Sequence, residues 1–514
     1  MMNEVAIDSR FLQPCDVPGE TFAIEPFTMV IFGGGGDLAK RKLMPTLFHL
    51  CGSEGILKDF SVLGFGRSKM SDEEYRSVMK EAVQEFGVEH VNEDQWNEFS
   101  RHLFFFSGFF EDDDAYRRLR ETIDRIAIPA SDGGKDLIFY LAVPPQTVPV
   151  LIEKLLRHNF CKRSYRTKII VEKPFGRDRA SAETLNTILT GAFEENQIYR
   201  IDHYLGKEPV QNILYFRFSN MIFERLWNCR CIDNIQITVA EDIGIEHRGA
   251  FYEQTGVVRD IVQNHMLQLI ALVGMEPLVG FKADFLRDEA VKVFRSIRPV
   301  DDAYIDKFMV RGQYGPGKVG EDEVPGYREE ERVSPESNIQ TFFAGKFYID
   351  NLRWAGVPFY VRTGKRMQRR ITEVAVQFKR LPLRLLGRTC DVMEPNILLL
   401  TIQPDEEITL RFNVGYPHSH NRLYSTNMVF KYRDTFGTKQ QEAYERLLLD
   451  CVRGDLTLFV RQDAIETMWE VVDPIVARWA NLAPADFPNY AAGTWGPEEA
   501  LLLLKNEGRS WITA

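Results

Sequence analysis

Short apolar runs alternate with longer amphipathic stretches through the first two hundred residues. The runs have the length and the β-branched or aromatic content of buried strands. The first of them leads through four consecutive glycines into a stretch at 38–50 that predicts a helix. Strands separated by helical patterns form βαβ units, so this part is predicted to be α/β, with a doubly wound, Rossmann-type parallel sheet. The predicted strands are 28–32, 61–65, 103–106, 137–141, 168–171 and 198–201.

The pattern changes after about residue 202. Apolar and polar residues alternate with a period of two in some segments, which predicts half-buried strands, and long helical patterns separate these segments. The strands are predicted at 234–239, 372–378 and 407–412, and the helices at 257–273, 440–452 and 464–479. Strands without regular βαβ alternation predict a larger α+β domain with a mainly antiparallel sheet. The Gly-, Pro- and Glu-rich stretch 315–340 is predicted to be an exposed loop.

We therefore expect three regions along the chain. Residues 1–27 carry no periodic pattern and are predicted to be a mobile N-terminal tail. Residues 28–202 are predicted to form the dinucleotide-binding domain, since six strands in this length complete such a sheet. Residues 203–514 are predicted to form the α+β domain.

The charge balance narrows the class of partner. Lys and Arg number 63 and Asp and Glu number 74, so the formal net charge of the 514 residues is −11. An acidic excess argues against nonspecific nucleic-acid binding and against a polybasic membrane patch. No apolar run approaches the ~18 residues of a membrane span. The seven scattered cysteines favour a reducing, cytoplasmic compartment, and we interpret the lone C-x-C of Cys229 and Cys231 as structural rather than metal-binding.

The four glycines stand where a dinucleotide loop belongs, between a strand and a helix. Glycine permits positive φ and lets a pyrophosphate approach the backbone, while the helix N-terminus supplies N–H groups and the positive end of its dipole. The spacing is Gly33-x-x-Gly36, followed by Asp37 and Leu38, and not a full G-x-G-x-x-G. A plain turn is therefore the alternative to a cofactor loop.

The strand ends bear on the type of cofactor. NAD sites usually place an acid after the second strand to bind the ribose 2′-hydroxyl, whereas an arginine accommodates the 2′-phosphate of NADP. Here Arg67 follows the second strand and favours NADP; its alternative is a solvated loop residue. Tyr140 ends the fourth strand and Lys173 the fifth, on the edge where doubly wound sheets bind ligands. The alternative for Lys173 is a surface ion pair with Glu172.

The segment 200–209, Arg-Ile-Asp-His-Tyr-Leu-Gly-Lys-Glu-Pro, bunches polar groups just before a predicted helix that begins near its proline. Two possible cations, a phenol and the N–H groups of a helix N-terminus make an anion site that suits phosphate. Its side chains are Asp202, His203, Tyr204 and Lys207. The alternative is an ordinary helix cap with an ion pair between Lys207 and Glu208.

Segment 200–208 resembles the active-site signature of the glucose-6-phosphate dehydrogenase family. Other segments resemble the cofactor, catalytic-helix and substrate segments of that family and follow its order across about residues 28–510. These are Gly33-x-x-Gly-Asp-Leu-Ala-Lys, Phe139-Tyr-Leu-Ala-x-Pro-Pro, Glu172-Lys-Pro-Phe-Gly, Arg259-Asp-x-x-Gln-Asn-His, Pro358-Phe-Tyr-Val-Arg-Thr-Gly-Lys and Gln403-Pro. The resemblance implies oxidation of glucose 6-phosphate at C1 to 6-phosphogluconolactone with reduction of NADP, the first step of the oxidative pentose phosphate pathway. It also implies homodimers or homotetramers, with a C-terminal domain for substrate binding and oligomerisation.

The resemblance also implies roles for individual residues. His265 would be the general base that removes the C1 hydroxyl proton, and Asp202 would orient its imidazole and stabilise the imidazolium. The 6-phosphate would be held by His203, Tyr204 and Lys207, the sugar hydroxyls by Glu241 and Asp260, with Lys365 and Gln403 closing the site and Lys173 bridging sugar and cofactor. One departure is Gly35, where many members of the family carry Ser or Thr, and it weakens the preference for NADP over NAD.

Two other interpretations compete with this one. The triplet Glu172-Lys-Pro also resembles a motif of the glucose–fructose oxidoreductase-like family, but a neutral sugar needs no phosphate site at 203–207. A non-catalytic NADPH-binding regulator would keep the fold, but it would not need Asp202, His265 and Lys173 together.

Overall fold

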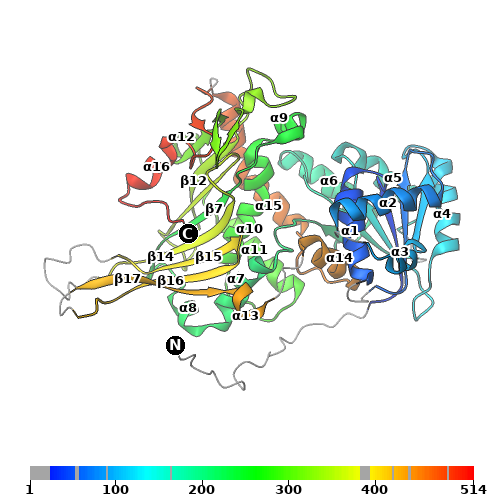
Figure 1. Ribbon diagram of the computed structural model, residues 1–514, viewed down its shortest axis with the longest axis horizontal. Helices are drawn as coiled ribbons and strands as arrows, with labels where there is room; N and C mark the ends of the chain where they lie inside the picture. Colours follow the sequence, from blue (N-terminus) through cyan, green and yellow to red (C-terminus); the bar gives the residue numbers. More distant parts are fainter. Residues whose placement is uncertain are drawn as a thin grey trace.

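Figure 1 shows the computed structural model as two halves, one built on a parallel sheet and the other on a long, mainly antiparallel sheet. The structure describes residues 24–52, 57–87, 91–161, 165–381, 394–418, 422–437, 442–482 and 485–513. Residues 1–23 of the predicted tail lie outside these ranges. The predicted tail extends too far at its other end, because Phe27 begins the first strand and Glu25 accepts hydrogen bonds from Ser131.

The N-terminal sheet is six-stranded and wholly parallel, in the order β3-β2-β1-β4-β5-β6. This is the doubly wound order of dinucleotide-binding folds, and it confirms the predicted fold class. All of β1 is buried, because helices cover both faces of the sheet, and this explains why every residue of the strand except Thr28 is apolar. The strands are β1 (Phe27–Phe32), β2 (Phe60–Gly66), β3 (Leu103–Ser107), β4 (Asp136–Leu141), β5 (Arg166–Val171) and β6 (Ile198–Arg200).

The helices around this sheet begin at local sequence signals. Ser71 and Glu74 form a capping box that starts α2, and Asp178 and Ser181 form one that starts α6. The predicted helix at 38–50 is two pieces, because a π-helical turn, η2 (Ala39–Leu43), precedes α1. The helices are α1 (Met44–Gly52), α2 (Asp72–Phe86), α3 (Glu93–Ser100), α4 (Asp113–Ile126), α5 (Val148–Arg157) and α6 (Arg179–Ala192), with 3-10 turns η3 (Pro145–Thr147) and η4 (Glu195–Gln197).

The C-terminal sheet is eight-stranded, in the order β17-β16-β15-β14-β7-β13-β12-β8. Every neighbouring pair is antiparallel except β7 and β13, which confirms the prediction of a mainly antiparallel sheet. Its strands are β7 (Ile232–Ala240), β8 (Met309–Gly312), β12 (Phe342–Tyr348), β13 (Pro358–Gly364), β14 (Ile371–Phe378), β15 (Ile397–Gln403), β16 (Glu407–Gly415) and β17 (Leu423–Lys431).

The predicted helix at 257–273 is the π-helical segment η6 (Val258–Met266), which continues into α10 (Leu267–Gly274). The predicted helix at 464–479 is α15 (Gln462–Asn481). The predicted helix at 440–452 is α14 (Ala443–Arg453), which returns to the N-terminal domain and packs against α1 (Figure 1). The other helices are α7 (Glu208–Ser219), α8 (Met221–Leu226), η5 (Glu246–Arg248), α9 (Gly249–Val257), α11 (Ala283–Ser296), α12 (Asp302–Phe308), α13 (Tyr432–Phe436) and α16 (Glu498–Lys505).

The predicted exposed loop at 315–340 contains regular structure. Within it, β10 (Gly317–Val319) pairs with β11 (Asp322–Val324), and the short turn η7 (Tyr327–Glu329) follows. At its start, β9 (Tyr314–Gly315) pairs with β18 (Tyr490–Ala491). The loop prediction is wrong for this part, because Tyr327 is buried and donates to Glu253 at 2.7 Å, which anchors a segment of loop-like composition.

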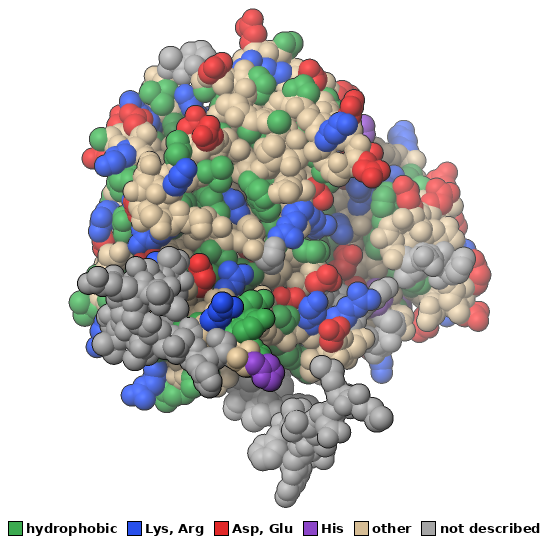
Figure 2. Space-filling view, turned by 60° about the vertical axis from the view of Figure 1, so that its left-hand side comes forward, with side chains coloured by type: hydrophobic (Ala, Val, Ile, Leu, Met, Phe, Trp, Pro, Cys, Tyr) green, Lys and Arg blue, Asp and Glu red, His purple; other side chains and the backbone are tan. Residues whose placement is uncertain are grey.

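Figure 2 shows the molecule turned so that the C-terminal sheet domain comes forward. Acidic and basic side chains are interspersed on this face among hydrophobic ones, and neither the acidic nor the basic side chains form a continuous patch. Among the helices that the structure describes, none has the length and apolar character to cross a membrane.

Candidate active site

Two adjoining cavities contain most of the predicted site residues. They share a wall formed by Lys173, His203 and Phe251. The smaller cavity has a volume of about 250 Å³ and is also lined by Tyr204, Glu241, Asp260, His265 and Lys365. The larger cavity has a volume of about 1080 Å³ and is also lined by Asp37, Leu38, Lys207 and Gln403. Residues from distant segments of the chain therefore meet where the two domains adjoin.

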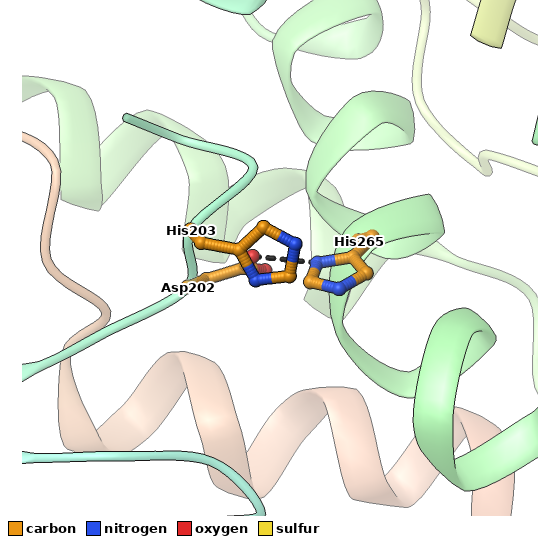
Figure 3. Close-up of side chains that lie close together, drawn as sticks. All are labelled: Asp202, His203 and His265. Carbon is orange, nitrogen blue, oxygen red and sulfur yellow. Dashed lines mark ion pairs between the residues drawn. The ribbon is translucent and has the colours of Figure 1, made fainter. Parts of the chain in front are cut away.

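Asp202 and His265 form a buried pair at the inner end of the smaller cavity. Asp202 follows β6 and His265 lies on η6, and the two side chains point toward one another (Figure 3). Asp202 Oδ1 is 2.5 Å from His265 Nδ1, a close contact whose angles are not those of a hydrogen bond and which becomes an ion pair when the imidazole is protonated. The side chains are 2% and 1% exposed. The Tyr204 backbone N–H also donates to Asp202 Oδ1, at 3.0 Å, and holds the carboxylate in place.

Aromatic rings fix the orientation of the His265 imidazole. The Tyr204 ring stacks on it with centroids 4.0 Å apart, and the His203 ring meets it edge-on at 4.6 Å. Burial lowers the pKa of His265 well below its usual value, and the ammonium of Lys173 lowers it further. Burial likewise lowers the pKa of His203. His265 is therefore unprotonated at neutral pH and able to accept a proton.

Lys173 contacts the other nitrogen of the same imidazole. Its Nζ is 2.8 Å from His265 Nε2, 3.2 Å from the Asp260 backbone oxygen and 3.4 Å from Asp260 Oδ1. The proposed surface pair with Glu172 is not formed by this side chain. Burial raises the pKa of Asp260, but Lys173 and Lys365 outweigh it and lower that pKa to about 2. Asp260 is thus a carboxylate, and His265 Nε2 faces the Lys173 cation.

The cationic end of the site lies at the start of α7. Lys207 Nζ donates to Gln403 Oε1 at 2.8 Å and lies 3.9 Å from the centre of the Tyr204 ring. The predicted alternative, a pair between Lys207 and Glu208, is not observed. Burial lowers the pKa of Lys207 to about 8, and the positive charge of Arg370 adds to this effect. Lys207 and Arg370 both line the larger cavity, which places two cations beside the N-terminus of α7.

Glu241 and Lys365 pair at the opposite wall of the smaller cavity. Glu241 follows β7 and Lys365 follows β13, which are parallel neighbours, so the two residues leave the sheet side by side. Lys365 Nζ makes a short contact with Glu241 Oε2, and the Lys365 side chain is buried. Tyr490 donates to the Lys365 backbone oxygen at 2.8 Å. This end presents carboxylates with neutralised charge, which suits hydroxyl donors.

The glycine loop has the close approach that a dinucleotide loop requires. Gly33 has a φ of +84°, and a Cβ there would lie 2.3 Å from the Ala142 backbone oxygen. The Gly33 and Gly34 N–H groups donate to the Phe65 oxygen, and the Gly36 N–H donates to the Gly33 oxygen at 2.8 Å. Only glycine fits at position 33, and the turn opens directly into the helical segment that begins beyond Leu38.

Four candidate cofactor residues do not line either cavity: Gly33, Gly36, Arg67 and Tyr140. Arg67 is exposed just beyond β2. Tyr140 is fully buried and its hydroxyl donates to Glu172 Oε1 in a short contact, while its contact with the cofactor stays a prediction. The sequence placed Tyr140 at the correct strand end but could not indicate its side-chain direction.

The residues lining the two cavities that the sequence analysis did not propose include three that bear a charge or a phenol. Arg370 and Tyr444 line the larger cavity, and Arg248 lines the smaller one. Arg370 stands five residues after Lys365, across the turn from β13 to β14, and that proximity is the only signal that the sequence offered. Tyr444 lies on α14, which periodicity predicted as a helix without indicating where it packs.

One group of possible metal ligands occurs among the described residues. Ligand atoms of Asp202, His203 and His265 lie within 4.8 Å of one another. The Lys173 ammonium already contacts His265 Nε2, and a metal ion there would be repelled by that charge. The arrangement therefore favours proton transfer over metal binding. Cys229 and Cys231 do not belong to this group; Cys229 Sγ contacts the Leu352 backbone oxygen at 3.5 Å.

Comparisons with known proteins agree across the whole chain. Two family models match: "Glucose-6-phosphate dehydrogenase, NAD binding domain" over residues 30–212, and "Glucose-6-phosphate dehydrogenase, C-terminal domain" over residues 214–512. Glucose-6-phosphate 1-dehydrogenase of Chlamydia pneumoniae is 43% identical over 496 residues, covering 95% of this chain and 96% of that protein. The enzyme of the same name from Bacillus subtilis is 40% identical over 489 residues, covering 94% and 97%.

Solved structures show the same likeness. A glucose-6-phosphate dehydrogenase in complex with its substrate glucose 6-phosphate matches with a TM-score of 0.86 at 33% identity, covering 96% of this chain and 100% of that one. Glucose-6-phosphate 1-dehydrogenase from Mycobacterium avium matches with a TM-score of 0.81 at 34% identity, covering 95% and 99%.

Proposed function

The chain belongs to the glucose-6-phosphate dehydrogenase family, and we infer that it is an enzyme that oxidises glucose 6-phosphate at C1 to 6-phosphogluconolactone, with hydride transfer to a nicotinamide dinucleotide. The observation that carries the inference is the buried Asp202–His265 pair. His265 lines the smaller cavity, and the adjoining larger cavity is lined by Asp37 and Leu38 after the glycine loop and by the cations Lys207 and Arg370.

His265 is the general base of this reaction. Its Nδ1 faces Asp202, so Nε2 is the nitrogen that accepts the C1 hydroxyl proton. Asp202 holds the imidazole in this tautomer and stabilises the imidazolium that forms. Lys173 Nζ contacts Nε2, so the sugar hydroxyl has to displace that contact, after which Lys173 binds an oxygen of the sugar. The bound dinucleotide supplies the hydride acceptor.

The two ends of the site recognise different groups of the sugar phosphate. Lys207, His203 and Tyr204 hold the 6-phosphate beside the N-terminus of α7, and we add Arg370 to this set because it lines the same cavity. Asp260 and the Glu241–Lys365 pair bind the sugar hydroxyls, and Gln403 orients Lys207. Binding the remote phosphate fixes C1 beside His265 and turns binding energy into orientation.

NADP is the cofactor that this site favours over NAD. The positive φ of Gly33 and its packing against Ala142 form the tight turn of a dinucleotide loop, and Gly36, Asp37 and Leu38 lead from it into the helical segment, whose N-terminus suits a pyrophosphate. Arg67 follows β2, where a cation accommodates the 2′-phosphate, while Gly35 supplies no hydroxyl for it. Arg67 is therefore the main determinant of cofactor choice.

Steady-state kinetics test this function. Rates of dinucleotide reduction are compared for glucose 6-phosphate and glucose, each with NADP and with NAD. We expect turnover of the phosphorylated sugar with NADP to exceed the other three combinations. Equal turnover of glucose would overturn the phosphate site and favour a neutral-sugar oxidoreductase. NADPH binding without turnover of either sugar would favour a regulator.

We also propose that the chain forms homodimers or homotetramers through the C-terminal sheet. Large apolar side chains that a monomer would leave in water gather on β17, at its partner β16 and on α8, a pattern typical of an interface. They are Tyr416, Tyr424, Met428, Val429, Phe430, Met221 and Ile222, the last two 74% and 69% exposed. Light scattering coupled to size exclusion gives the mass directly; a mass of 59.4 kDa at assay concentrations would refute the proposal.

A further inference from the structure

Glu172, the residue before Lys173, is hydrogen-bonded to phenols from both domains. Its Oε1 accepts two hydrogen bonds, a short one from Tyr140 on β4 and one of 3.2 Å from Tyr444 on α14. Tyr140 is fully buried, while Glu172 and Tyr444 are partly buried in the wall of the larger cavity. Burial raises the pKa of Glu172, and the two phenols oppose this effect. One carboxylate oxygen thus joins three segments of the chain.

Tyr444 reaches Glu172 because α14 is tied to the N-terminal domain at both ends. At its start, Glu442 pairs with Lys42 at 3.2 Å. At its end, Lys168 of β5 donates to two backbone oxygens of the last turn, at 2.9 and 2.7 Å, where a cation is favoured. Lys168 on β5 therefore holds the C-terminal end of α14. Glu172, which directly follows β5, contacts Tyr444 near the N-terminal end of the same helix.

Glu172 and Lys173 are consecutive, yet their side chains contact different groups. Glu172 binds the two phenols, and Lys173 Nζ lies 2.8 Å from His265 Nε2. We propose that Glu172 is a positioning residue: by fixing the end of β5 between Tyr140 and Tyr444, it holds Lys173 beside the nitrogen of His265 that receives the proton, within reach of the sugar oxygen that Lys173 binds when the sugar hydroxyl takes its place. The proposal rests on the proposed function, since it gives the Lys173–His265 contact a place in that reaction.

The charge of Lys173 makes its position measurable at His265. The groups that face His265 are Asp202, His203, Tyr204 and Lys207 after β6, Asp260 on its own segment, Lys365 after β13, and Lys173. After burial, Lys173 is the largest cause of the lowered pKa of His265. The groups that face Glu172 are Tyr140, Tyr444 and Lys173. If Lys173 withdraws, the pKa of His265 rises, because a neighbouring positive charge is lost.

The first test is the pH dependence of kcat/KM for glucose 6-phosphate in Glu172→Ala. The base must be neutral, so activity falls as the pH drops through the pKa of His265. With Lys173 displaced, we expect this acid limb to move to higher pH by about one unit, and kcat to fall about tenfold or more. Tyr444→Phe removes one of the two hydrogen bonds and is expected to shift the limb in the same direction by less. Glu172→Gln keeps an oxygen acceptor and is expected to stay close to wild type.

A matched control and a double mutant separate positioning from general damage. Tyr165 donates to Asp124 at 2.9 Å just before the other end of β5, so Tyr165→Phe also removes a phenol–carboxylate bond and should leave the profile unchanged. In a Lys173→Ala background, Glu172→Ala should produce no further shift. A further shift there, or a wild-type limb in both Glu172→Ala and Tyr444→Phe, overturns the proposal. Tyr444→Phe carries the test if Glu172→Ala does not fold.

A crystal structure of the same variants decides the question without turnover. We expect Lys173 Nζ to leave hydrogen-bond range of His265 Nε2 in Glu172→Ala, or in Tyr444→Phe if the former does not fold. A contact that stays at 2.8 Å overturns the proposal. This arm also distinguishes the two inferences: a wild-type protein that oxidises no glucose 6-phosphate defeats the proposed function, whereas an unmoved Lys173 defeats the positioning role.

Discussion

Replacing Asp202 by Asn should remove most of the activity and leave the fold intact. The carboxamide has the shape of the carboxylate, and its oxygen can take the place of Oδ1, which contacts both His265 Nδ1 and the Tyr204 N–H. The amide nitrogen then takes the place of Oδ2, a buried atom without a hydrogen-bond partner. Geometry is thus preserved, and the change is confined to the charge beside the imidazole.

The expected magnitude follows from the separation of the charges. With an N–O distance of 2.5 Å the two charge centres are roughly 4 Å apart, and at an effective dielectric constant of about 20 their attraction is about 4 kcal/mol. If this attraction exists only when His265 is protonated, its loss lowers kcat by about a thousandfold. The same replacement in the serine protease triad lowers kcat by about ten-thousandfold. We therefore expect kcat of Asp202→Asn to fall by about a thousandfold to about ten-thousandfold.

The stability of the folded protein should rise or stay unchanged in Asp202→Asn, although its activity falls. Burial raises the pKa of Asp202 in the folded state, so the ionised carboxylate opposes folding once the pH exceeds that pKa, and its contribution to stability is lost as the pH rises. Asn carries no charge and is free of this cost. Thermal unfolding at pH 8 should therefore give a melting temperature no lower than that of wild type.

The assay is initial-rate reduction of NADP at saturating glucose 6-phosphate, with thermal unfolding on the same preparations. Asp202→Asn combined with His265→Asn should be no slower than the worse single variant by more than a small factor, because the two residues act as a unit. A folded Asp202→Asn protein with kcat within tenfold of wild type would falsify the role of Asp202 as the partner of the base.

Three further predictions follow from individual contacts. His265→Asn should lower kcat by about a hundredfold or more, as loss of a general base does, while equilibrium binding of glucose 6-phosphate, measured by calorimetry, is kept; near-normal kcat would refute the assignment. Arg370→Met should raise KM for glucose 6-phosphate by about tenfold, the cost of a charge-assisted hydrogen bond, and should leave KM for NADP unchanged; a shift in both would place Arg370 elsewhere. Gly33→Ala should weaken NADP binding in fluorescence titrations, because a Cβ would lie 2.3 Å from the Ala142 oxygen; undiminished affinity would show that the loop can move aside.

The parallel sheet could be predicted from the sequence because strands that are buried on both faces consist almost entirely of apolar residues. Every residue of β1 is buried and all but Thr28 are apolar, and the glycines after the strand mark a sharp turn. The same double burial means that the sequence does not specify the side-chain direction of Tyr140. Neighbouring residues of β4 point to opposite faces, and both faces are covered, so the composition of 137–141 does not tell which side chain reaches the cleft and which reaches Glu172.

Long-range packing explains the rest of what the sequence could not predict. Arg370 enters the site through the turn from β13 to β14, and Tyr444 enters because Lys168 and Lys42 hold α14 on the other domain. Neither residue stands in a periodic pattern that indicates its neighbours. The π-helical form of η6 was also beyond prediction, because its apolar spacing is close to that of an α-helix. The segment 315–340 differs from its prediction because a buried Tyr327 anchors it.

The net charge of −11 and a site for a phosphorylated sugar are compatible because charge is compensated differently at the two ends of the site. At the sugar end, Lys365 pairs with Glu241 and Lys173 with Asp260, so cations and carboxylates cancel where the ligand offers hydroxyl groups. At the other end, Lys207 bonds the neutral amide of Gln403, and Arg370 lies near enough to lower the pKa of Lys207. The positive charges of Lys207 and Arg370 act on a bound phosphate at contact distance, whereas salt screens the acidic residues that are dispersed over the surface within about 8 Å. The balance inside the cleft, and not the net charge, therefore sets the sign of the ligand.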